Sequence, residues 1–283
     1  MNHSIKMIVT DLDDTLLRTD KTISEFTRSV LSKCRNSGIK VAYATGRGES
    51  NAHVAPPEMF DGRISMNGAK ARVGDMIIYN RPIPHLTVRS FLIACHKRGI
   101  KITSESGGWH YSNFTVSDKW PFITNFSIVD FKEHDMDAEK IYSVDLTGKD
   151  IDFIKETIPD SLHMVISRDG IMQIMHRDAT KSNALRELAR YWGIAQTEVV
   201  VFGDDLNDID MLKYAGIGVA MVNALDEVKA VADCLCDSCD NDGVAKWIEG
   251  NIIKENQPDY PGKLIINTIE GRESRFIKEL SDI

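Results

Sequence analysis

Acidic residues gather in two short clusters that lie far apart in the sequence. Each cluster directly follows an apolar run, which is typical of a buried strand that delivers carboxylates at its carboxyl end. If both strands belong to one parallel sheet, the carboxylates converge, repel one another and shift one another's pKa. A divalent cation relieves this repulsion, and hard oxygen ligands favour Mg²⁺, so we predict a magnesium site. The members are Asp11, Asp13 and Asp14 in the first cluster, and Asp204, Asp205 and Asp208 in the second.

The spacing of Asp11 and Asp13 suits phosphoryl transfer in two steps. One aspartate can attack phosphorus and become an aspartyl phosphate. The other can protonate the leaving group and later activate a water molecule. Residues two apart in an extended strand face the same way, and a strand that leaves into a loop lets both carboxylates approach one phosphorus atom.

Neutral donors and one cation can bind the remaining charge of a phosphate group. Thr45 offers a hydroxyl, and the backbone of Gly46 can approach a ligand closely. Lys181 follows the expected N-cap residue Thr180, and at a helix start its ammonium group and the free amides can bind the same anion. Asn207 supplies an amide donor from the second acidic cluster.

These residues need a parallel sheet to bring them together. Apolar runs that alternate with helices predict such a sheet, and its ligands gather beyond the carboxyl ends of the strands. A capping box of Thr22 and Glu25 predicts the start of the first helix, and Gly38 its end. The expected strands of this part are 6–10, 39–44, 64–66, 198–202, 218–221 and 232–235, and a second helix contains residues 184–192.

The pattern changes after Pro82, where a helix and short strands with aromatics and turns predict an inserted α+β domain. The neighbours Trp109, His110 and Tyr111 are interpreted either as lining a substrate pocket or as part of the domain core. The expected elements of the insertion are a helix over 86–96 and strands over 101–104, 109–111, 142–146, 162–167 and 171–175.

Composition excludes several classes of protein. The chain has 283 residues, and 34 Lys and Arg against 42 Asp and Glu give a net charge of −8. An acidic chain lacks the electrostatic footprint of a nucleic-acid binder, and no apolar run approaches the length of a membrane span. Residues 1–6 contain no apolar stretch of a secretory signal, and five scattered cysteines do not indicate a disulfide scaffold. We therefore expect a cytoplasmic protein with no nucleic-acid or membrane partner.

Two further segments have weaker signals. Cys234, Cys236 and Cys239 permit a zinc interpretation, but only three cysteines cluster without a nearby histidine, so a buried strand is favoured. Residues 251–283 form a mixed tail, in which the helical spacing of Phe276 and Leu280 predicts a helix docked on the core or on a second subunit.

Four motifs in order resemble the haloacid dehalogenase (HAD) superfamily. The run Asp-Leu-Asp-Asp-Thr-Leu-Leu at 11–17 resembles its first motif, and Thr45 within Ala-Thr-Gly-Arg resembles the second. Lys181 within Thr-Lys-Ser-Asn-Ala-Leu resembles the third, and Gly-Asp-Asp-Leu-Asn-Asp at 203–208 the fourth. The loop at 66–69 and the stretch 220–233 are similar to the Cof-like branch, so the resemblance covers about residues 6–250.

The resemblance implies a Rossmann-like parallel-sheet core of residues 1–82 and 176–283, with an inserted α/β cap of type II (IIB) at 83–175. It implies Mg²⁺-dependent phosphoryl transfer through a phosphoaspartate. Asp14 departs from the family, because many members have glycine there, and its side chain is expected to face solvent. By this resemblance the nucleophile is Asp11 and the acid/base is Asp13. The metal ligands that it implies are Asp11, the Asp13 main-chain carbonyl and Asp204, with Asp208 as a more distant or water-mediated partner. It also implies that Arg47 and Asn67 lie near the substrate phosphate.

The leading hypothesis is a phosphatase that hydrolyses a small phosphorylated metabolite, such as a sugar phosphate. A phosphomutase with the same core is one alternative, and a non-catalytic protein that binds a phosphorylated ligand is another. The sequence leaves open whether the protein is a monomer or a homodimer, and it does not name the substrate.

Overall fold

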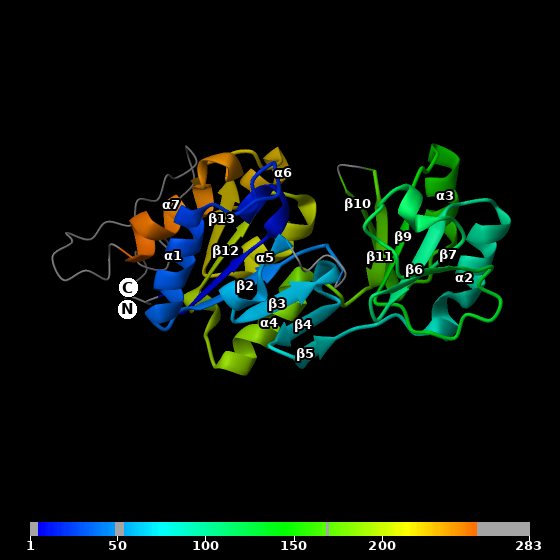
Figure 1. Cartoon of the computed structure of the whole chain (residues 1–283), viewed down its shortest axis with the longest axis horizontal. Coiled ribbons are helices and arrows are strands. Elements are labelled where there is room, and N and C mark those ends of the chain that lie inside the picture. Colours follow the sequence, from blue (N-terminus) through cyan, green and yellow to red (C-terminus); the bar gives the residue numbers. More distant parts are fainter. Residues whose placement is uncertain (1–4, 49–53, 168–169, 254–283) are drawn as a thin grey trace. The chain divides into compact units, whose positions relative to one another are not determined.

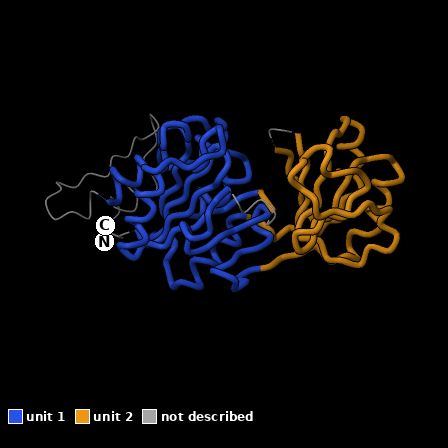
Figure 2. Tube along the Cα trace, viewed as in Figure 1, with its two compact units in different colours: residues 1–46, 52–79, 181–283 blue, residues 47–51, 80–180 orange. Residues whose placement is uncertain are grey.

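The computed structural model describes residues 5–48, 54–167 and 170–253. Contacts between residues divide the chain into two compact units (Figure 2). The core unit comprises Met1–Gly46, Ala52–Tyr79 and Lys181–Ile283, and the inserted unit comprises Arg47–Asn51 and Asn80–Thr180. The chain thus leaves the core unit at residue 80 and returns at residue 181, where the sequence analysis placed these changes at 83 and 176.

An eight-stranded sheet forms the centre of the core unit in the described residues (Figure 1). Neighbouring strands from β14 through β3 run parallel, as expected for a Rossmann-like core, whereas β4 pairs with β3 in the antiparallel direction. The order across the sheet is β14 (Cys234–Cys236), β13 (Ile217–Met221), β12 (Val199–Gly203), β1 (Met7–Thr10), β2 (Lys40–Ala44), β3 (Gly62–Ser65), β4 (Lys70–Val73) and β5 (Met76–Asn80).

The central strands lie between layers of helices, and every residue of β1 and β12 is buried. That burial explains their uninterrupted apolar sequences, because a parallel sheet covered on both faces has no solvent side. Helix α1 packs against α7, and α4 packs against α5. The helices of this unit are α1 (Glu25–Asn36), α4 (Lys181–Trp192), α5 (Ile209–Tyr214), α6 (Asp226–Lys229) and α7 (Gly243–Ile248).

Two local predictions for the core unit differ from the structure. The capping box of Thr22 and Glu25 is wrong: Ser24 is the N-cap residue of α1, and its hydroxyl accepts a hydrogen bond from the amide of Thr27 at 3.0 Å. Thr22 instead donates its hydroxyl to Asp20. Strands β4 and β5 were not predicted, because the chain reverses after β3 within the short turn Met66–Gly68.

The inserted unit contains a six-stranded sheet in its described residues, with α2 (His85–Lys97) and α3 (Gly148–Thr157) beside it. Helix α3 begins with a capping box of Thr147 and Asp150, which the sequence analysis missed together with β8. The order across this sheet is β10 (Leu162–Ile166), β11 (Met172–His176), β9 (Lys140–Ser143), β6 (Ile102–Ser106), β7 (Trp109–Ser112) and β8 (Phe126–Ile128).

The cysteine cluster lies on and after the edge strand β14, as the structural interpretation favoured. Cys234, Cys236 and Cys239 are all buried and free, and burial raises the pKa of Cys234 to about 12. In the described part of the chain, none of them belongs to a group of potential metal ligands.

No helix of the described residues is long and apolar enough to cross a membrane. The helix predicted around Phe276 and Leu280 lies outside the described residues.

Candidate active site

Four neighbouring strands of the core sheet end at one edge and deliver the residues that the sequence analysis singled out. Asp204 follows β12, Asp11 follows β1, Thr45 follows β2 and Asn67 lies just after β3. Backbone hydrogen bonds join these ends, since the amide of Asp11 donates to Phe202 at 2.9 Å and the amide of Asn67 donates to Thr45 at 3.0 Å. The parallel topology therefore brings together residues that lie far apart in the sequence, such as Asp11 and Asp204.

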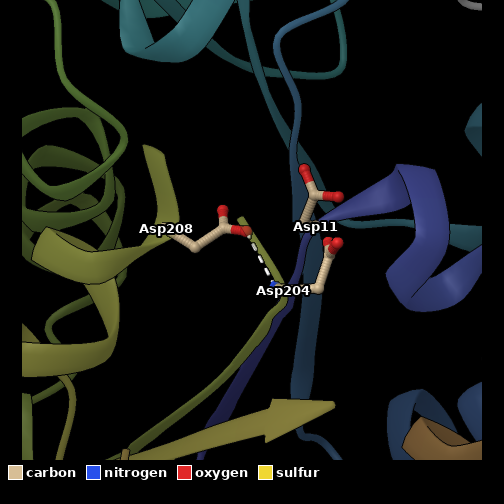
Figure 3. A group of neighbouring side chains, drawn as sticks. All are labelled: Asp11, Asp204 and Asp208. Carbon is tan, nitrogen blue, oxygen red and sulfur yellow. Dashed lines mark hydrogen bonds between the residues drawn. The ribbon is translucent and has the colours of Figure 1, made fainter. Parts of the chain in front are cut away.

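Three buried carboxylates form the centre of this edge. One oxygen each of Asp11, Asp204 and Asp208 lie within 4.8 Å of one another, and all three residues are buried. Figure 3 shows Asp11 and Asp204 on adjacent chain segments with Asp208 turned toward them. Within residues 5–48, 54–167 and 170–253 this is the only such group of potential metal ligands.

Lys181 neutralises part of this charge. It is the first residue of α4, and its Nζ donates to an oxygen of Asp11 and to an oxygen of Asp208, both at 2.6 Å. Burial works against the charged ammonium of Lys181, but the two carboxylates outweigh burial and raise the pKa of Lys181. The lysine therefore stays protonated and holds Asp11 in position.

The electrostatic environment of Asp11 disfavours its ionised form. Burial raises the pKa of Asp11 well above 3.8, and the neighbouring charges of Asp208 and Asp204 add to this effect. Lys181 acts in the opposite direction without cancelling it. A further cation near these carboxylates would therefore favour ionisation of Asp11.

Asp208 is bound to the protein through both carboxylate oxygens. One oxygen accepts from Lys181, and the other accepts from the backbone amides of Asp204 at 3.0 Å and Asp205 at 3.1 Å. The neighbouring Gly203 leaves room for this arrangement, because any Cβ there would clash with the carboxylate of Asp208. Asp208 thus fixes the loop that carries Asp204.

Asp13 and Asp14 occupy the turn Leu12–Leu16 that follows Asp11. The carboxylate of Asp13 is 36% exposed and lies 3.1 Å from Nζ of Lys21. Asp14 has a φ of 57°, a left-handed conformation that costs glycine nothing, which explains why glycine suits this position. Its side chain is exposed, and it also pairs with Lys21 at 3.3 Å.

Two supporting residues of the site were not assigned a role from sequence. The hydroxyl of Thr15 donates to Asp204 at 2.7 Å, which ties the first acidic cluster to the second. Asn223 donates to the backbone carbonyl of Asp14 at 2.8 Å and accepts from the amide of Cys239 at 3.2 Å. The only sequence signal for Asn223 was its place in the stretch that resembles the Cof-like branch.

The expected phosphate-binding residues fall into two groups. Asn207 donates its side-chain amide to Asn67 at 2.8 Å, and Gly46 lies against the same asparagine, so these three residues are neighbours of Thr45 at the sheet edge. Arg47 belongs by its contacts to the inserted unit, whereas the carboxylates belong to the core unit.

The composition of the site fits a divalent cation. Three buried carboxylates face one ammonium group, which leaves an excess of negative charge in a region with little water. The potential ligands are all carboxylate oxygens, the donor type that Mg²⁺ prefers over softer metals. Both oxygens of Asp208 already hold Lys181 and the loop that carries Asp204.

Comparison with known sequences now identifies the family. The chain matches the haloacid dehalogenase-like hydrolases over residues 8–248. The chain belongs to this family. The resemblance drawn from the four motifs is thereby confirmed, and a phosphatase structure of HAD subclass IIB among the neighbours supports the Cof-like branch.

Several relatives of this HAD hydrolase are phosphatases. It is 27% identical to 5-amino-6-(5-phospho-D-ribitylamino)uracil phosphatase YitU of Bacillus subtilis, over 86% of this chain and 96% of that protein. A HAD phosphatase structure from Bacteroides thetaiotaomicron shares 27% identity at a TM-score of 0.76, over 88% of this chain and 96% of that chain. A subclass IIB sugar phosphatase structure shares 28% identity at a TM-score of 0.76, covering 87% and 98%. Family and relatives together support a phosphoric monoester hydrolase.

Proposed function

We propose that this HAD hydrolase is a Mg²⁺-dependent phosphatase that acts on a small phosphomonoester of the sugar-phosphate kind through an aspartyl phosphate. The observation that carries the proposal is the buried cluster of Asp11, Asp204 and Asp208 with Lys181 at 2.6 Å from Asp11. A fixed, buried carboxylate beside an ammonium group is suited to attack a phosphoryl group and to tolerate its charge.

The first step forms the phosphoenzyme. A carboxylate oxygen of Asp11 attacks phosphorus, the bond from phosphorus to the ester oxygen breaks, and Asp13 gives its proton to that oxygen so that an alcohol leaves. Asp13 lies in a partly exposed turn two residues from Asp11, where it can exchange protons with solvent. Lys181 holds Asp11 and offsets the charge of the phosphoryl oxygens.

The second step releases phosphate. Asp13, now ionised, takes a proton from a water molecule whose oxygen attacks phosphorus, and the bond from phosphorus to the Asp11 oxygen breaks. This regenerates both carboxyl groups and yields inorganic phosphate. Thr45 and the amide of Asn207 are the proposed neutral donors to the phosphoryl oxygens during both steps.

Asp11, Asp204 and the backbone carbonyl of Asp13 are the proposed ligands of Mg²⁺. When bound, the ion supplies positive charge that lowers the repulsion between the carboxylates and the phosphoryl group. Asp208 supports the set by fixing the Asp204 loop, and Thr15 orients the Asp204 carboxylate.

The substrate class follows from the relatives. One relative is a phosphatase of a phosphorylated ribitylamino compound, and a structural neighbour is a sugar phosphatase. Both descriptions concern small phosphorylated molecules that carry several hydroxyl groups, so we propose a substrate of that kind.

A phosphate-release screen tests the proposed function. Sugar phosphates, polyol phosphates and p-nitrophenyl phosphate are incubated with the enzyme and Mg²⁺ or with EDTA. We expect release from a few related compounds, and at least about a 100-fold loss with EDTA, because the carboxylate cluster then repels the phosphoryl group. Transfer of phosphate without its release would indicate a mutase. Binding without turnover would indicate a non-catalytic protein, and either result would overturn the phosphatase proposal.

Mg²⁺ is also expected to stabilise the folded protein. At about ten times its Kd, a ligand of the native state adds roughly 1.4 kcal/mol, which corresponds to about 3–5 °C in the thermal midpoint. Asp204→Asn keeps the oxygen that accepts from Thr15 but removes a buried charge. We expect this variant to lose the Mg²⁺-dependent shift without a lower midpoint in EDTA.

Asp226→Asn is the matched control, because Asp226 is a fully exposed carboxylate of the same unit whose nearest cation is Lys229 at 3.6 Å. It should keep the wild-type shift with Mg²⁺. A shift that survives in Asp204→Asn would exclude the cluster as the metal site.

A further inference from the structure

Strand β5 lies at one edge of the core sheet, where β4 is its one neighbouring strand among the described residues. The two strands are joined by the short turn of Gly74 and Asp75, in which Gly74 has a φ of 55°. A guanidinium nitrogen of Arg72 donates to the backbone carbonyl of Asp75 at 3.1 Å and holds this turn. The outer side of β5 therefore presents backbone amides and carbonyls to which another strand can bind.

The side chains of β5 leave this edge without the usual protection. Met76 and Ile77 are 56% and 47% exposed, and the strand contains neither the proline nor the lysine that commonly prevents pairing at an edge. The opposite edge strand of the same sheet, β14, has only three residues, two of them buried. An exposed apolar edge of five residues is a template for pairing with a further strand.

The sequence of β5 is complementary to itself when two copies run antiparallel. In a pair centred on Ile78, the two copies of Ile78 lie opposite each other, and Ile77 lies opposite Tyr79 of the second copy. Side chains directly opposite in antiparallel strands contact each other, and a β-branched residue facing an aromatic one stabilises such a pair. Tyr79 is already buried in the core of its own unit, which fixes the surface that Ile77 of the second copy would cover.

The charges that flank β5 favour the same register. Asp75 precedes the strand, Arg81 follows it, and both residues are exposed. A pair centred on Ile78 places Asp75 of each copy opposite Arg81 of the other, so two pairs of opposite charge form. A pair centred on Ile77 would instead set Asp75 against Tyr79. A pair centred on Tyr79 would set Ile77 against Arg81.

The direction of the backbone groups is consistent with this centre. In a hairpin closed by a two-residue turn, the residue after the turn directs its amide and carbonyl toward the partner strand, and this direction alternates along the strand. The backbone groups of Ile77 and Tyr79 therefore point away from β4. A pair centred on Ile78 brings these outward groups together, Ile77 of one copy against Tyr79 of the other, so both copies satisfy their edge.

We propose that the outer side of β5 binds a second copy of this chain, through an antiparallel pair of β5 strands centred on Ile78. The core sheets of the two copies then continue into each other, and Met76 and Ile77 lose their exposure to water. One strand from each copy makes this contact, so the interface is small and the dimer dissociates on dilution, with a Kd of about 1–100 µM. The association does not depend on the proposed phosphatase function.

Sedimentation velocity measures the association over chain concentrations from about 1 to 300 µM. We expect the wild type to change from one chain to two across this range. Ile77→Lys should remain a single chain, because pairing would desolvate two ammonium groups. Val222→Lys is the control, since Val222 is 50% exposed and follows β13 near the opposite edge of the sheet, and it should associate as the wild type does.

Charge reversal tests the register. Asp75→Arg and Arg81→Asp each set like charges opposite one another at two places, so we expect each to raise the Kd about tenfold or more. The variant with both changes restores opposite charges and should return to within about threefold of the wild type. An equimolar mixture of the two single variants should likewise form a heterodimer. Asp226→Arg, which changes an exposed carboxylate on α6, should leave the Kd unaltered.

Disulfide formation tests the centre of the pair. Opposite residues of antiparallel strands have Cα atoms about 4.5–5.5 Å apart, which is within the range that a disulfide spans. The five native cysteines are buried, so they do not compete. Under mild oxidation Ile78→Cys should form a covalent dimer, whereas Val222→Cys should not.

All of these substitutions except Ile78→Cys change exposed side chains, so each variant should unfold within about 3 °C of the wild type when both are dilute. A wild type that stays a single chain at every concentration overturns the proposal, whether another protein or another segment of the chain covers β5. A dimer that survives Ile77→Lys would place the contact on another surface. Failure of the double charge reversal to restore the Kd, or of Ile78→Cys to cross-link, would reject the pair centred on Ile78.

Discussion

Asp11→Asn is expected to abolish phosphate release, with a loss in kcat on the order of 10⁴-fold or more, while the protein stays folded. An amide is not a nucleophile toward phosphorus, so the phosphoenzyme cannot form. The asparagine oxygen can still accept from Lys181, which donates to Asp11 at 2.6 Å in the wild type. Release is measured on the best substrate of the screen, and acid-quenched enzyme is tested for labelled phosphate that hydroxylamine removes.

The same variant makes a prediction for stability. Burial raises the pKa of Asp11 well above 3.8, so in EDTA the ionised carboxylate costs folding free energy at neutral pH. Because the folded pKa is raised, this cost is absent below the unfolded pKa of about 3.9 and grows as the pH rises through the folded value. In EDTA, Asp11→Asn should therefore melt at a higher temperature than the wild type at pH 7, and the difference should shrink toward pH 4.

Asp14→Asn is the matched control for the nucleophile. Asp14 lies in the same turn with an exposed side chain, and asparagine tolerates its left-handed backbone at φ 57°. It should keep activity within about threefold of the wild type, since nothing in the proposed reaction uses its carboxylate. Loss of activity in Asp14→Asn together with full activity in Asp11→Asn would indicate that Asp14 is the nucleophile, and the assignment of Asp11 would be wrong.

The sequence predicted the active-site edge because a buried parallel strand has a strong signature. The apolar runs that become β1 and β12 end directly before Asp11 and Asp204, and parallel strands bring their carboxyl ends to one edge. The contact between Lys181 and Asp11, 170 residues apart, follows from this topology once α4 begins at Lys181. The length and the apolar residues of such a strand are local features, so they can be read from the sequence.

What the sequence could not predict depends on contacts between distant segments. Thr22 and Ser24 are equally good cap residues, and tertiary structure decides between them, because Thr22 bonds to Asp20 while Ser24 caps α1. Strand β5 exposes Met76 and Ile77 at the sheet edge, so its burial pattern gives little signal. The capping box of α3 was present in the sequence and was overlooked.

The supporting residues of the site have the same limitation. Nothing in the sequence distinguishes Thr15 from other threonines, and its role follows from the hydrogen bond that its hydroxyl donates to Asp204 at 2.7 Å in the folded protein. Asn223 likewise acquires its role from the backbone carbonyl of Asp14, which lies 209 residues away in sequence. The residue types in a sequence indicate which chemistry is available, whereas the fold determines which residues of each type lie at the site.

Lys181→Met is expected to lose activity by about 10²–10³-fold and also to destabilise the protein. The ammonium of Lys181 is buried between Asp11 and Asp208, so its removal leaves two carboxylates without their cation. Breaking a buried ion pair from one side costs about 3–5 kcal/mol. Urea unfolding in EDTA should show this loss, and saturating Mg²⁺ should restore part of it.

A double variant separates the two effects of the lysine. In Lys181→Met with Asp208→Asn, the unpaired charge at residue 208 is gone, and the asparagine oxygen can still accept from the amide of Asp204. We expect the double variant to regain much of the lost stability in EDTA but to remain as inactive as Lys181→Met, because the ammonium group that lies beside Asp11 in the wild type is still missing. Recovery of activity together with stability would mean that Lys181 serves only to hold the fold, and its proposed part in catalysis would be wrong.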